Sequence, residues 1–253
     1  MDLKERIDKE KLPMHVALIM DGNGRWARQR GKERIFGHEN GIEAVRDTVK
    51  AAADLGVQYL TFFAFSTENW CRPHKEVETL MDLLVRAIGN ETPELNENGV
   101  RLQAIGDLES LPEVCREKLR EALELTANNN KLIVTVALSY SARWEVVNAV
   151  QKIARKIAER TINPDEVDEE LFVNHLETAN IPDPDLLIRT SGELRLSNFL
   201  LWQMAYTELY FTPVFWPDFR RKHFYQAIID YQRRERRFGK VNNQPVISKN
   251  ILK

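Results

Sequence analysis

The sequence is poor in several features that would each point to a particular class of protein. It has only two cysteines, Cys71 and Cys115, so neither a disulfide framework nor a paired-cysteine metal site is indicated. Its formal net charge is −2, which is not typical of a general nucleic-acid binder. No apolar run is long enough to span a bilayer. Any anion site must therefore come from arginines that gather locally.

The ends of the chain and the common catalytic motifs exclude further classes. Residues 1–11 are charged and lack the apolar core of a signal peptide, so we expect a cytoplasmic protein with reduced thiols. A G-x-S-x-G elbow, an H-E-x-x-H pair and a Walker lysine pattern are all missing, which argues against the usual hydrolases. Because there is no internal repeat or low-complexity linker, we expect one domain over residues 13–239, with terminal extensions at 1–12 and 240–253.

The patterns that are present predict an α/β protein. At 253 residues with 43% hydrophobic residues, the chain can bury a substantial core. Short apolar runs alternate with segments of helical periodicity, so we expect a single domain with a mostly parallel sheet wrapped by helices. The sheet should have about six strands, at residues 16–20, 57–65, 100–106, 132–138, 185–189 and 208–211.

The most informative stretch is HVALIMDGNGRW, residues 15–26. A buried strand ends at Asp21, and Gly22, Asn23, Gly24 and Arg25 then open a helical segment rich in basic residues. Glycines let backbone N–H groups approach a phosphate, and an acid at a strand end can hold Mg²⁺ that a diphosphate also ligates. On this pattern alone, a tight turn without a ligand is an equal interpretation.

Other predicted strands also end in polar side chains. In an open parallel sheet, ligands bind outside the carboxyl ends of the strands, so these groups should share one rim. Several arginines with two acids suit phosphate groups and one divalent cation, and they are too many for a single phosphate monoester. The groups that we assign to this rim, besides the first turn, are Ser66, Asn69, Trp70, Arg72, Arg189, Arg195, Ser197 and Glu208.

A strongly apolar helix is expected over residues 77–88, with a break near Thr92 and Pro93. An aliphatic helix face usually packs on a sheet as core, which is the simplest interpretation here. The alternative is that part of this helix lines an apolar cavity, with the strand at 132–138 as a second wall. A bulky substitution such as Ala137→Leu would then narrow that cavity.

Several segments resemble the signatures of the cis-prenyltransferase family, in which the nearest members are bacterial undecaprenyl diphosphate synthases. They are HVALIMDGNGRWARQRG, FFAFSTENWCRP, IRTSGELRLSNFLLWQ and AYTELYF, in the family's order and spread over residues 15–239. The resemblance implies an enzyme that extends farnesyl diphosphate by repeated cis condensation with isopentenyl diphosphate, using Mg²⁺. It also implies a homodimer, a polyprenyl diphosphate product that serves as a precursor of the carrier lipid for cell-wall polysaccharide synthesis, and a possible place at the membrane surface.

The resemblance further implies a role for each matching residue. Asp21 corresponds to the catalytic, metal-binding acid, and Glu208 to a second metal ligand on the same rim or from the other subunit. Asn69 corresponds to a proposed proton acceptor, although an amide is a weak base and could equally orient a diphosphate oxygen or a water. The substrate contacts implied in this way are Gly22, Asn23, Gly24, Arg25, Trp26, Arg34, His38, Ser66, Thr67, Glu68, Trp70, Arg72, Arg189, Arg195, Leu196 and Ser197.

One departure and two alternatives stand beside this interpretation. Family members often have N-Y-G-G-R after the fourth strand, whereas this chain has SYSAR at 139–143, which leaves the loop geometry open. A catalytically silent subunit that binds a partner is a second hypothesis, but the chain retains Asp21, Arg189, Arg195 and Glu208. A trans-type prenyl synthase would need a D-D-x-x-D motif, which the chain lacks.

Overall fold

Six short apolar segments form the strands of one sheet, in a computed structural model that describes residues 3–235. All five strand pairings are parallel, and the strand order is β3-β4-β2-β1-β5-β6. The α/β class and the parallel sheet are therefore confirmed, while the tail expected beyond residue 239 lies outside the described residues. The strands are β1 (His15–Ile19), β2 (Tyr59–Ser66), β3 (Val100–Ile105), β4 (Leu132–Tyr140), β5 (Leu186–Arg189) and β6 (Glu208–Phe211).

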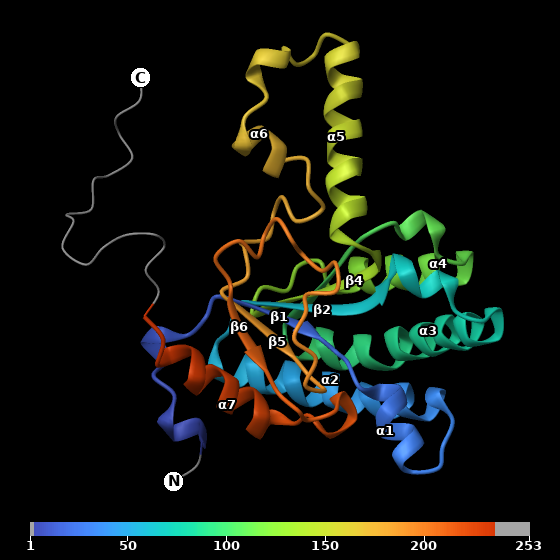
Figure 1. Cartoon of the computed structure of the whole chain (residues 1–253), viewed down its shortest axis with the longest axis vertical. Helices are drawn as coiled ribbons and strands as arrows, with labels where there is room; N and C mark the ends of the chain where they lie inside the picture. Colours follow the sequence, from blue (N-terminus) through green and yellow to red (C-terminus); the bar gives the residue numbers. More distant parts are fainter. Residues whose placement is uncertain (1–2, 236–253) are drawn as a thin grey trace.

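Helices connect the strands except between β5 and β6, where the connecting segment, which the structure describes in full, has no helix (Figure 1). The α-helices are α1 (Asn23–Gln29), α2 (Arg34–Leu55), α3 (His74–Glu97), α4 (Glu113–Thr126), α5 (Ala142–Ala158), α6 (Glu169–Val173) and α7 (Arg221–Gln232). Short 3₁₀ segments lie at Leu3–Arg6, Lys9–Lys11, Thr67–Cys71, Leu108–Ser110, Pro164–Glu166 and Trp216–Asp218. Within residues 3–235, no helix is both long enough and apolar enough to cross a membrane.

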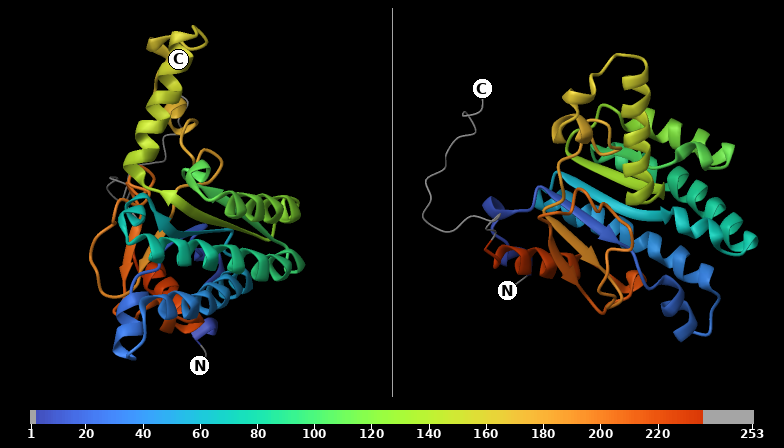
Figure 2. Two further views of the ribbon diagram at one scale, coloured as in Figure 1. Left: turned by 90° about the vertical axis from the view of Figure 1, so that its right-hand side faces the viewer. Right: turned by 45° about the horizontal axis from the view of Figure 1, so that its top comes forward.

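The two faces of the sheet are covered differently. Alternate residues of each strand point to opposite faces, and Leu18, Phe62 and Val134 pack on one face in the core beneath α2, α3 and α7. On the other face, Ala17 and Ala137 pack with buried side chains from the segment after β5, residues 199–204. In Figures 1 and 2, α5 and α6 project from this second side as an arm.

The arm is fixed to the sheet by a buried carboxylate. Glu145 of α5 accepts hydrogen bonds from the Tyr140 hydroxyl at 2.5 Å, the Gln203 amide at 3.0 Å and the backbone N–H of Glu177 at 3.0 Å. Burial raises the pKa of Glu145, and these three donors partly offset that shift. The base of α5 is thus tied to the end of β4 and to the segment that follows β5.

Helix α3 continues through Pro93 to Glu97, so the break expected near Thr92 and Pro93 is wrong. A proline removes one backbone donor, and the ring at Pro93 is exposed, so nothing packed against the helix is displaced. The Thr92 hydroxyl donates to the Ile88 carbonyl at 2.6 Å within the same turn. Helix α3 is therefore longer than the pattern indicated.

The loop that replaces the glycine pair is compatible with its residues. Ser141 is extended with φ −152°, and Ala142 begins α5, so neither position needs a glycine. The left-handed φ of +47° falls on Ser139, whose hydroxyl accepts from the Trp70 indole N–H at 2.9 Å. The departure from the family pattern leaves the junction between β4 and α5 intact.

Candidate active site

Asp21 follows β1 at the carboxyl edge of the sheet, as the sequence predicted. The next residue, Gly22, has φ +105°, and a Cβ there would lie 2.6 Å from the Phe215 ring, so the turn requires glycine. The Gly22 N–H donates to Oδ1 of Asp21 at 2.6 Å. Helix α1 then begins at Asn23. A Cβ on Gly24 would lie 2.9 Å from the Arg34 side chain, so a second close approach occurs in the same turn.

Two arginines hold the Asp21 carboxylate. Arg189 at the end of β5 donates to Oδ2 at 3.0 Å, and Arg25 of α1 lies 3.2 Å from the same oxygen. Burial alone would raise the pKa of Asp21, but the hydrogen bond and charge of Arg189 and the charge of Arg25 outweigh burial and lower it. Asp21 is therefore ionised at neutral pH and lies next to two cations.

The segment after β5 completes this first cluster. Glu193 bridges Arg25 at 2.7 Å and Arg195 at 2.5 Å, while Arg189 donates to the Ser197 hydroxyl at 2.6 Å. Four predicted residues from two strand ends, namely Arg25 after β1 and Arg189, Arg195 and Ser197 at or after the end of β5, are thus brought together with Asp21. Leu196 instead packs against the core cluster on the second face of the sheet.

Two members of the first cluster are not among the residues that the sequence predicted. Ser191 accepts from Arg25 at 2.6 Å, and Glu193 joins the arginines of two strand ends. Both stand in the TSGELR segment directly after β5, where an acid between arginines was the available signal.

A second basic cluster lies at the other side of the turn. Glu76 of α3 bridges Arg72 at 3.2 Å and Arg34 at 3.4 Å. His38 lies near these arginines, and burial, followed by the charges of Arg72 and Arg34, lowers its pKa to about 4. His38 is therefore neutral at physiological pH. Glu76 was also missed, although its position four residues after Arg72 is a helical ion-pair spacing.

The 3₁₀ segment after β2 carries the remaining predicted residues. The Ser66 N–H donates to Oδ1 of Asn69 at 3.2 Å in a capping box, and Thr67 lies 3.4 Å from the Glu68 carboxylate. Glu68 accepts from the Asn198 amide at 2.8 Å, which links this segment to the one after β5. The Trp70 ring packs edge-on against a β2 side chain, with 5.0 Å between the ring centroids.

Unpaired polar atoms concentrate at this edge of the sheet. Among the described residues, six buried side-chain N or O atoms lack a hydrogen-bond partner, and four of them belong to predicted site residues. These four are Asn23 Oδ1, Trp26 Nε1, His38 Nε2 and Arg189 Nε. The Trp26 indole is otherwise packed between Phe36 and the Arg30 guanidinium. Because buried polar groups are normally paired, the concentration is typical of a ligand site.

A cavity leads from this edge along the helical face of the sheet. Its head, with a volume of about 220 Å³, is lined by Asn23, His38, Asn69 and Arg72 together with apolar side chains. A second, deeper space of about 240 Å³ lies between α2, α3 and the sheet. The two share Met20, Val45, Ala64, Leu84 and Ala87, so they adjoin along the same face of the sheet, and we refer to the deeper space as the shaft.

The side chains that line the cavity can be compared with the two walls that the sequence predicted, a helix and a strand. Helix α3 lines it through Leu84, Ala87 and Ile88, and β4 through Val134 and Val136, so both expected walls are present. The position chosen on β4 was wrong: Ala137 packs in the core of the opposite face. The physical reason is that successive side chains of a strand point to opposite faces of the sheet, so every second side chain of β4 points away from the shaft.

Glu208 is not on the rim of its own chain, which corrects one of the two expectations. It is the first residue of β6 and is in register with Leu186 at the start of β5, so it lies at the amino edge of the sheet. There it pairs with Arg234 at 3.0 Å. Asp21 follows the end of β1 whereas Glu208 begins β6, so the two acids lie at opposite edges of the parallel sheet.

The donors fit a metal ion that is shared with a substrate. Within the described part of the chain, no three His, Cys, Asp or Glu side chains are grouped as a metal cage. Mg²⁺ is commonly held by one or two carboxylates and by substrate phosphates, which is what the half-exposed carboxylate of Asp21 beside arginines can supply.

Comparison with known proteins supports the same conclusion. The family model described as "Putative undecaprenyl diphosphate synthase" matches residues 19–239. An isoprenyl transferase of Heliobacterium mobile is 54% identical over 94% of this chain and 92% of its own length. A Vibrio cholerae protein named ditrans,polycis-undecaprenyl-diphosphate synthase, farnesyl-diphosphate specific, is 47% identical over 94% of this chain and 95% of its own.

A solved structure is also similar. The lavandulyl diphosphate synthase from Lavandula x intermedia, in complex with dimethylallyl diphosphate, superposes with a TM-score of 0.88. It is 38% identical, and the match covers 91% of this chain and 100% of that one.

Proposed function

This chain belongs to the undecaprenyl diphosphate synthase family of prenyltransferases, and on that premise we propose that it elongates farnesyl diphosphate by cis condensation with isopentenyl diphosphate. The product would be a long-chain polyprenyl diphosphate of the undecaprenyl class, a precursor of the carrier lipid for cell-wall polysaccharides. We assign the catalytic part to residues 13–239, of which the structure describes all but the last few.

The observation that carries the proposal is that a polar space and a largely apolar one adjoin along the same face of the sheet. The first is lined by His38 and Arg72 beside the Asp21 turn, and the second mainly by apolar side chains of α2, α3 and the strands, with charged side chains of α2 and α3 in its deep part. A diphosphate with a growing hydrocarbon tail has this same division between a charged head and an apolar chain. A phosphatase or a simple phosphate-binding protein does not need an apolar cavity beside its phosphate site.

The first chemical requirement is to stabilise a leaving diphosphate. Breaking the allylic carbon–oxygen bond places negative charge on that group, and fixed cations stabilise the charge most where it develops. The turn of Gly22 and Gly24 with Arg25, and the pair Arg34 and Arg72, are arranged to hold the allylic diphosphate. Asp21, ionised through its arginine neighbours, would hold Mg²⁺, which when bound supplies further charge neutralisation.

The second requirement is to position the isopentenyl diphosphate and to remove one proton. We assign its diphosphate to Arg195, Ser197 and Arg189, of which Arg189 contacts both Asp21 and Ser197. Asn69 lines the head of the cavity, but its amide oxygen already accepts from a backbone N–H. That contact favours an orienting role for Asn69 over that of a proton acceptor.

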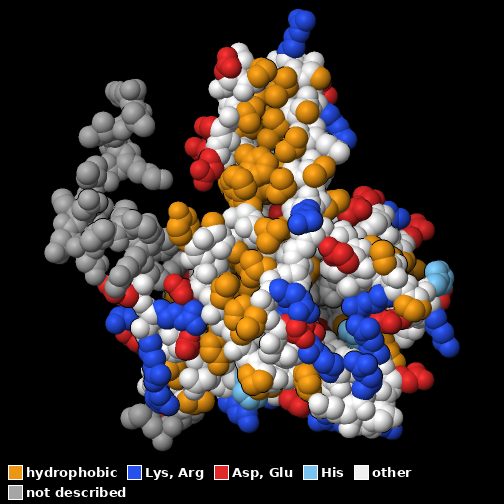
Figure 3. All heavy atoms as spheres, in the orientation of Figure 1, with side chains coloured by type: hydrophobic (Ala, Val, Ile, Leu, Met, Phe, Trp, Pro, Cys, Tyr) orange, Lys and Arg blue, Asp and Glu red, His pale blue; other side chains and the backbone are white. Residues whose placement is uncertain are grey.

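We also propose a homodimer. Exposed apolar side chains gather on α5 and on the segment before β6, including Val147, Val150, Trp202 and Tyr206. In Figure 3 hydrophobic side chains form a column along the arm and continue onto the body. A surface of this kind is typical of an association face. Glu208 lies on the edge strand β6, so it can serve a metal site only across such an interface.

The place of the reaction follows from the product. The substrates are taken up from water, so we propose a cytoplasmic enzyme. A long polyprenyl tail partitions into lipid, so we propose peripheral association with a membrane when product is bound. Co-sedimentation with lipid vesicles, with and without product, measures this association.

The test of the function is incubation with farnesyl diphosphate, labelled isopentenyl diphosphate and Mg²⁺, followed by sizing of the lipid product. We expect label in long polyprenyl diphosphates, and incorporation that stops when Mg²⁺ is chelated and returns when it is restored. The silent-subunit alternative predicts no incorporation by the purified chain, and a product with only trans double bonds would contradict the cis assignment.

A further inference from the structure

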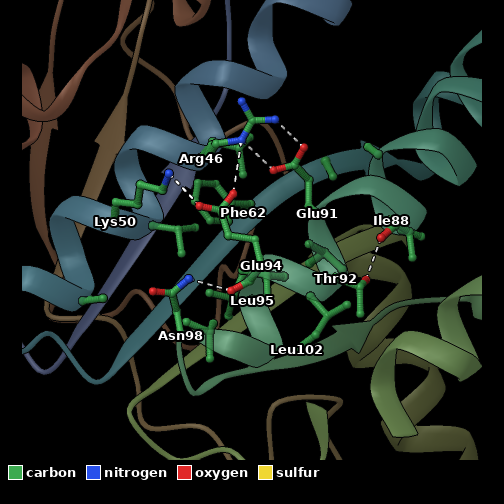
Figure 4. Close-up of a pocket in the computed structure, with 18 of the residues that line it drawn as sticks. Arg46, Lys50, Phe62, Ile88, Glu91, Thr92, Glu94, Leu95, Asn98 and Leu102 are labelled. Carbon is green, nitrogen blue, oxygen red and sulfur yellow. Dashed lines mark hydrogen bonds and ion pairs between the residues drawn. The ribbon is translucent and has the colours of Figure 1, made fainter. Parts of the chain in front are cut away.

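A network of ion pairs joins α2 and α3 over the deep part of the cavity (Figure 4). Arg46 of α2 donates from Nε and Nη2 to the two carboxylate oxygens of Glu91, at 2.8 and 2.6 Å. Lys50 lies 2.6 Å from Glu94, and Nε of Arg46 is 3.7 Å from the same residue. Four charged side chains thus span the gap between the two helices.

These four side chains also line the cavity itself. They stand beside Val49, Leu95 and other aliphatic side chains, and Asp54 and Lys131 line the same space, so the wall is charged as well as apolar at this depth. The level is far from Asp21, because the cavity here reaches Val100 at the start of β3 and Lys131 just before β4. The network therefore lines the deep part of the cavity, away from the diphosphate-binding edge.

The central pair has the geometry of a strong contact. A planar guanidinium that meets a carboxylate through two hydrogen bonds is the best defined of the protein ion pairs. The hydrogen bonds that Arg46 donates to Glu91 raise the pKa of Arg46, so its guanidinium stays charged. The side chains of the pair are only 35% and 19% exposed, so an apolar group pressed against them would remove much of their remaining hydration.

We propose that the Arg46–Glu91 pair, supported by Lys50 and Glu94, is the stop that limits the length of the product. The inference deepens the proposed function, because it concerns the same shaft and the same growing chain. Each condensation at the head pushes the tail further from Asp21. A tail that reaches this network must either break its ion pairs or lie against dehydrated charges, and both outcomes disfavour the addition of the next isoprene unit.

The chain supplies a matched control on the same helix. Asp47, next to Arg46, pairs with Arg221 of α7 at 2.6 Å and accepts a second hydrogen bond at 2.7 Å from the Arg221 backbone N–H. This contact is as short as the Arg46–Glu91 pair, but neither of its residues lines the cavity. Removing the Arg221 side chain also deprives α2 of an ion pair, but it leaves the side chains that line the shaft unchanged.

The experiment compares Arg46→Ala and Glu91→Ala with Arg221→Ala. Each variant is incubated with farnesyl diphosphate, labelled isopentenyl diphosphate and Mg²⁺, and both the initial rate and the distribution of product lengths are measured. We expect the first two variants to shift the distribution upward by at least one isoprene unit while the initial rate stays near that of the wild type. We expect Arg221→Ala to give the wild-type distribution.

Two further variants keep the test decisive if an alanine variant does not fold. Glu91→Gln preserves shape and removes the charge, and we expect it to broaden the distribution toward longer chains. The double exchange Arg46→Glu with Glu91→Arg restores an ion pair, and we expect it to return the distribution toward that of the wild type. Rescue by the exchange would not occur if the two side chains merely filled space.

The inference is overturned if folded Arg46→Ala, Glu91→Ala or Glu91→Gln protein makes products of unchanged or shorter length. It is also overturned if Arg221→Ala lengthens the product as much as Arg46→Ala does, since loosening of α2 would then explain both. Failure of the proposed function gives a different result, because the wild type itself would then incorporate no label.

Discussion

The head and the shaft of the cavity are built from the same sheet face and the same two helices, yet they differ in almost every physical property. At the head, Asp21 and His38 lie among arginines, and buried polar atoms are left without partners. Along the shaft, aliphatic side chains such as Leu84 and Val136 pack without unmet polar groups until the ion pairs in its deep part. From this difference we expect rate and product length to be set by separate residues.

The largest effect is expected at the head. Asp21→Ala removes the carboxylate that Arg189 and Arg25 hold, and with it the anchor proposed for Mg²⁺. We expect turnover to fall by a factor of about 10² to 10³ or more, as is usual when one charge-stabilising group is lost. Label incorporation measures the loss, and the circular dichroism spectrum should match that of the wild type. Near-normal turnover would contradict the assignment of Asp21.

Backbone strain at the head should give the next largest effect. Gly22→Ala places a Cβ at a φ of +105° and 2.6 Å from the Phe215 ring. We expect the free energy of unfolding to fall by roughly 1–3 kcal/mol, and the loss of turnover to exceed what this instability explains, because the turn carries Asp21. Denaturant unfolding measures the first quantity. Gly56→Ala is the control, since it also has a positive φ but meets no atom within 4 Å.

The shaft should respond in product length. Ala87 lines both parts of the cavity, so Ala87→Leu narrows the passage and should shorten the product while the initial rate is kept. Ala137→Leu is the matched comparison, because that side chain packs on the other face of the sheet. We expect it to cost stability through overpacking, about 1–3 kcal/mol, and to leave product length unchanged. Shortening by Ala137→Leu with none by Ala87→Leu would reverse the assignment of the walls.

The last effect is absent at neutral pH and appears only in acid. His38 has a folded-state pKa of about 4, below its ordinary value of 6.5, so the unfolded chain binds this proton at a higher pH than the folded chain does. The free energy of unfolding should therefore decrease between pH 6.5 and 4, by at most about 1.4 kcal/mol per pH unit from this group. His38→Asn should flatten the curve in urea titrations at several pH values.

Other groups set the background of that curve. Buried His15, whose pKa is also lowered to about 4, acts in the same direction, while Glu145, whose pKa is raised, acts in the opposite one. The difference between wild type and His38→Asn isolates the one histidine. An unchanged difference across the pH range would show that His38 is not buried in its neutral form.

Much of this division could be predicted from the sequence. The strands are short apolar runs, and parallel strands buried on both faces need no alternation to be recognised. Polar residues that follow such runs were correctly placed on one edge, as Asp21 and Arg189 show. The resemblance to the family then supplied roles that spacing alone could not.

What could not be predicted depends on relations between elements. Which face of β4 a residue occupies is invisible in a continuous apolar run, so Ala137 was placed on the wrong side. Glu208 stands at the start of a strand, and only the parallel register shows that this start lies away from the rim. The bridge that Glu193 forms between Arg25 and Arg195, and the ion pairs of Arg46, join segments whose approach is set by the fold.

The most direct measurement compares one variant of the head and one variant of the shaft in a single assay. Initial rate and product length are recorded together for the wild type, Asp21→Ala and Ala87→Leu, with farnesyl diphosphate, labelled isopentenyl diphosphate and Mg²⁺. We expect Asp21→Ala to lose rate while its residual product keeps the wild-type length, and Ala87→Leu to shorten the product at a preserved initial rate. If either variant changed both quantities in parallel, the charged head and the apolar shaft would not be separate parts of one catalytic cavity.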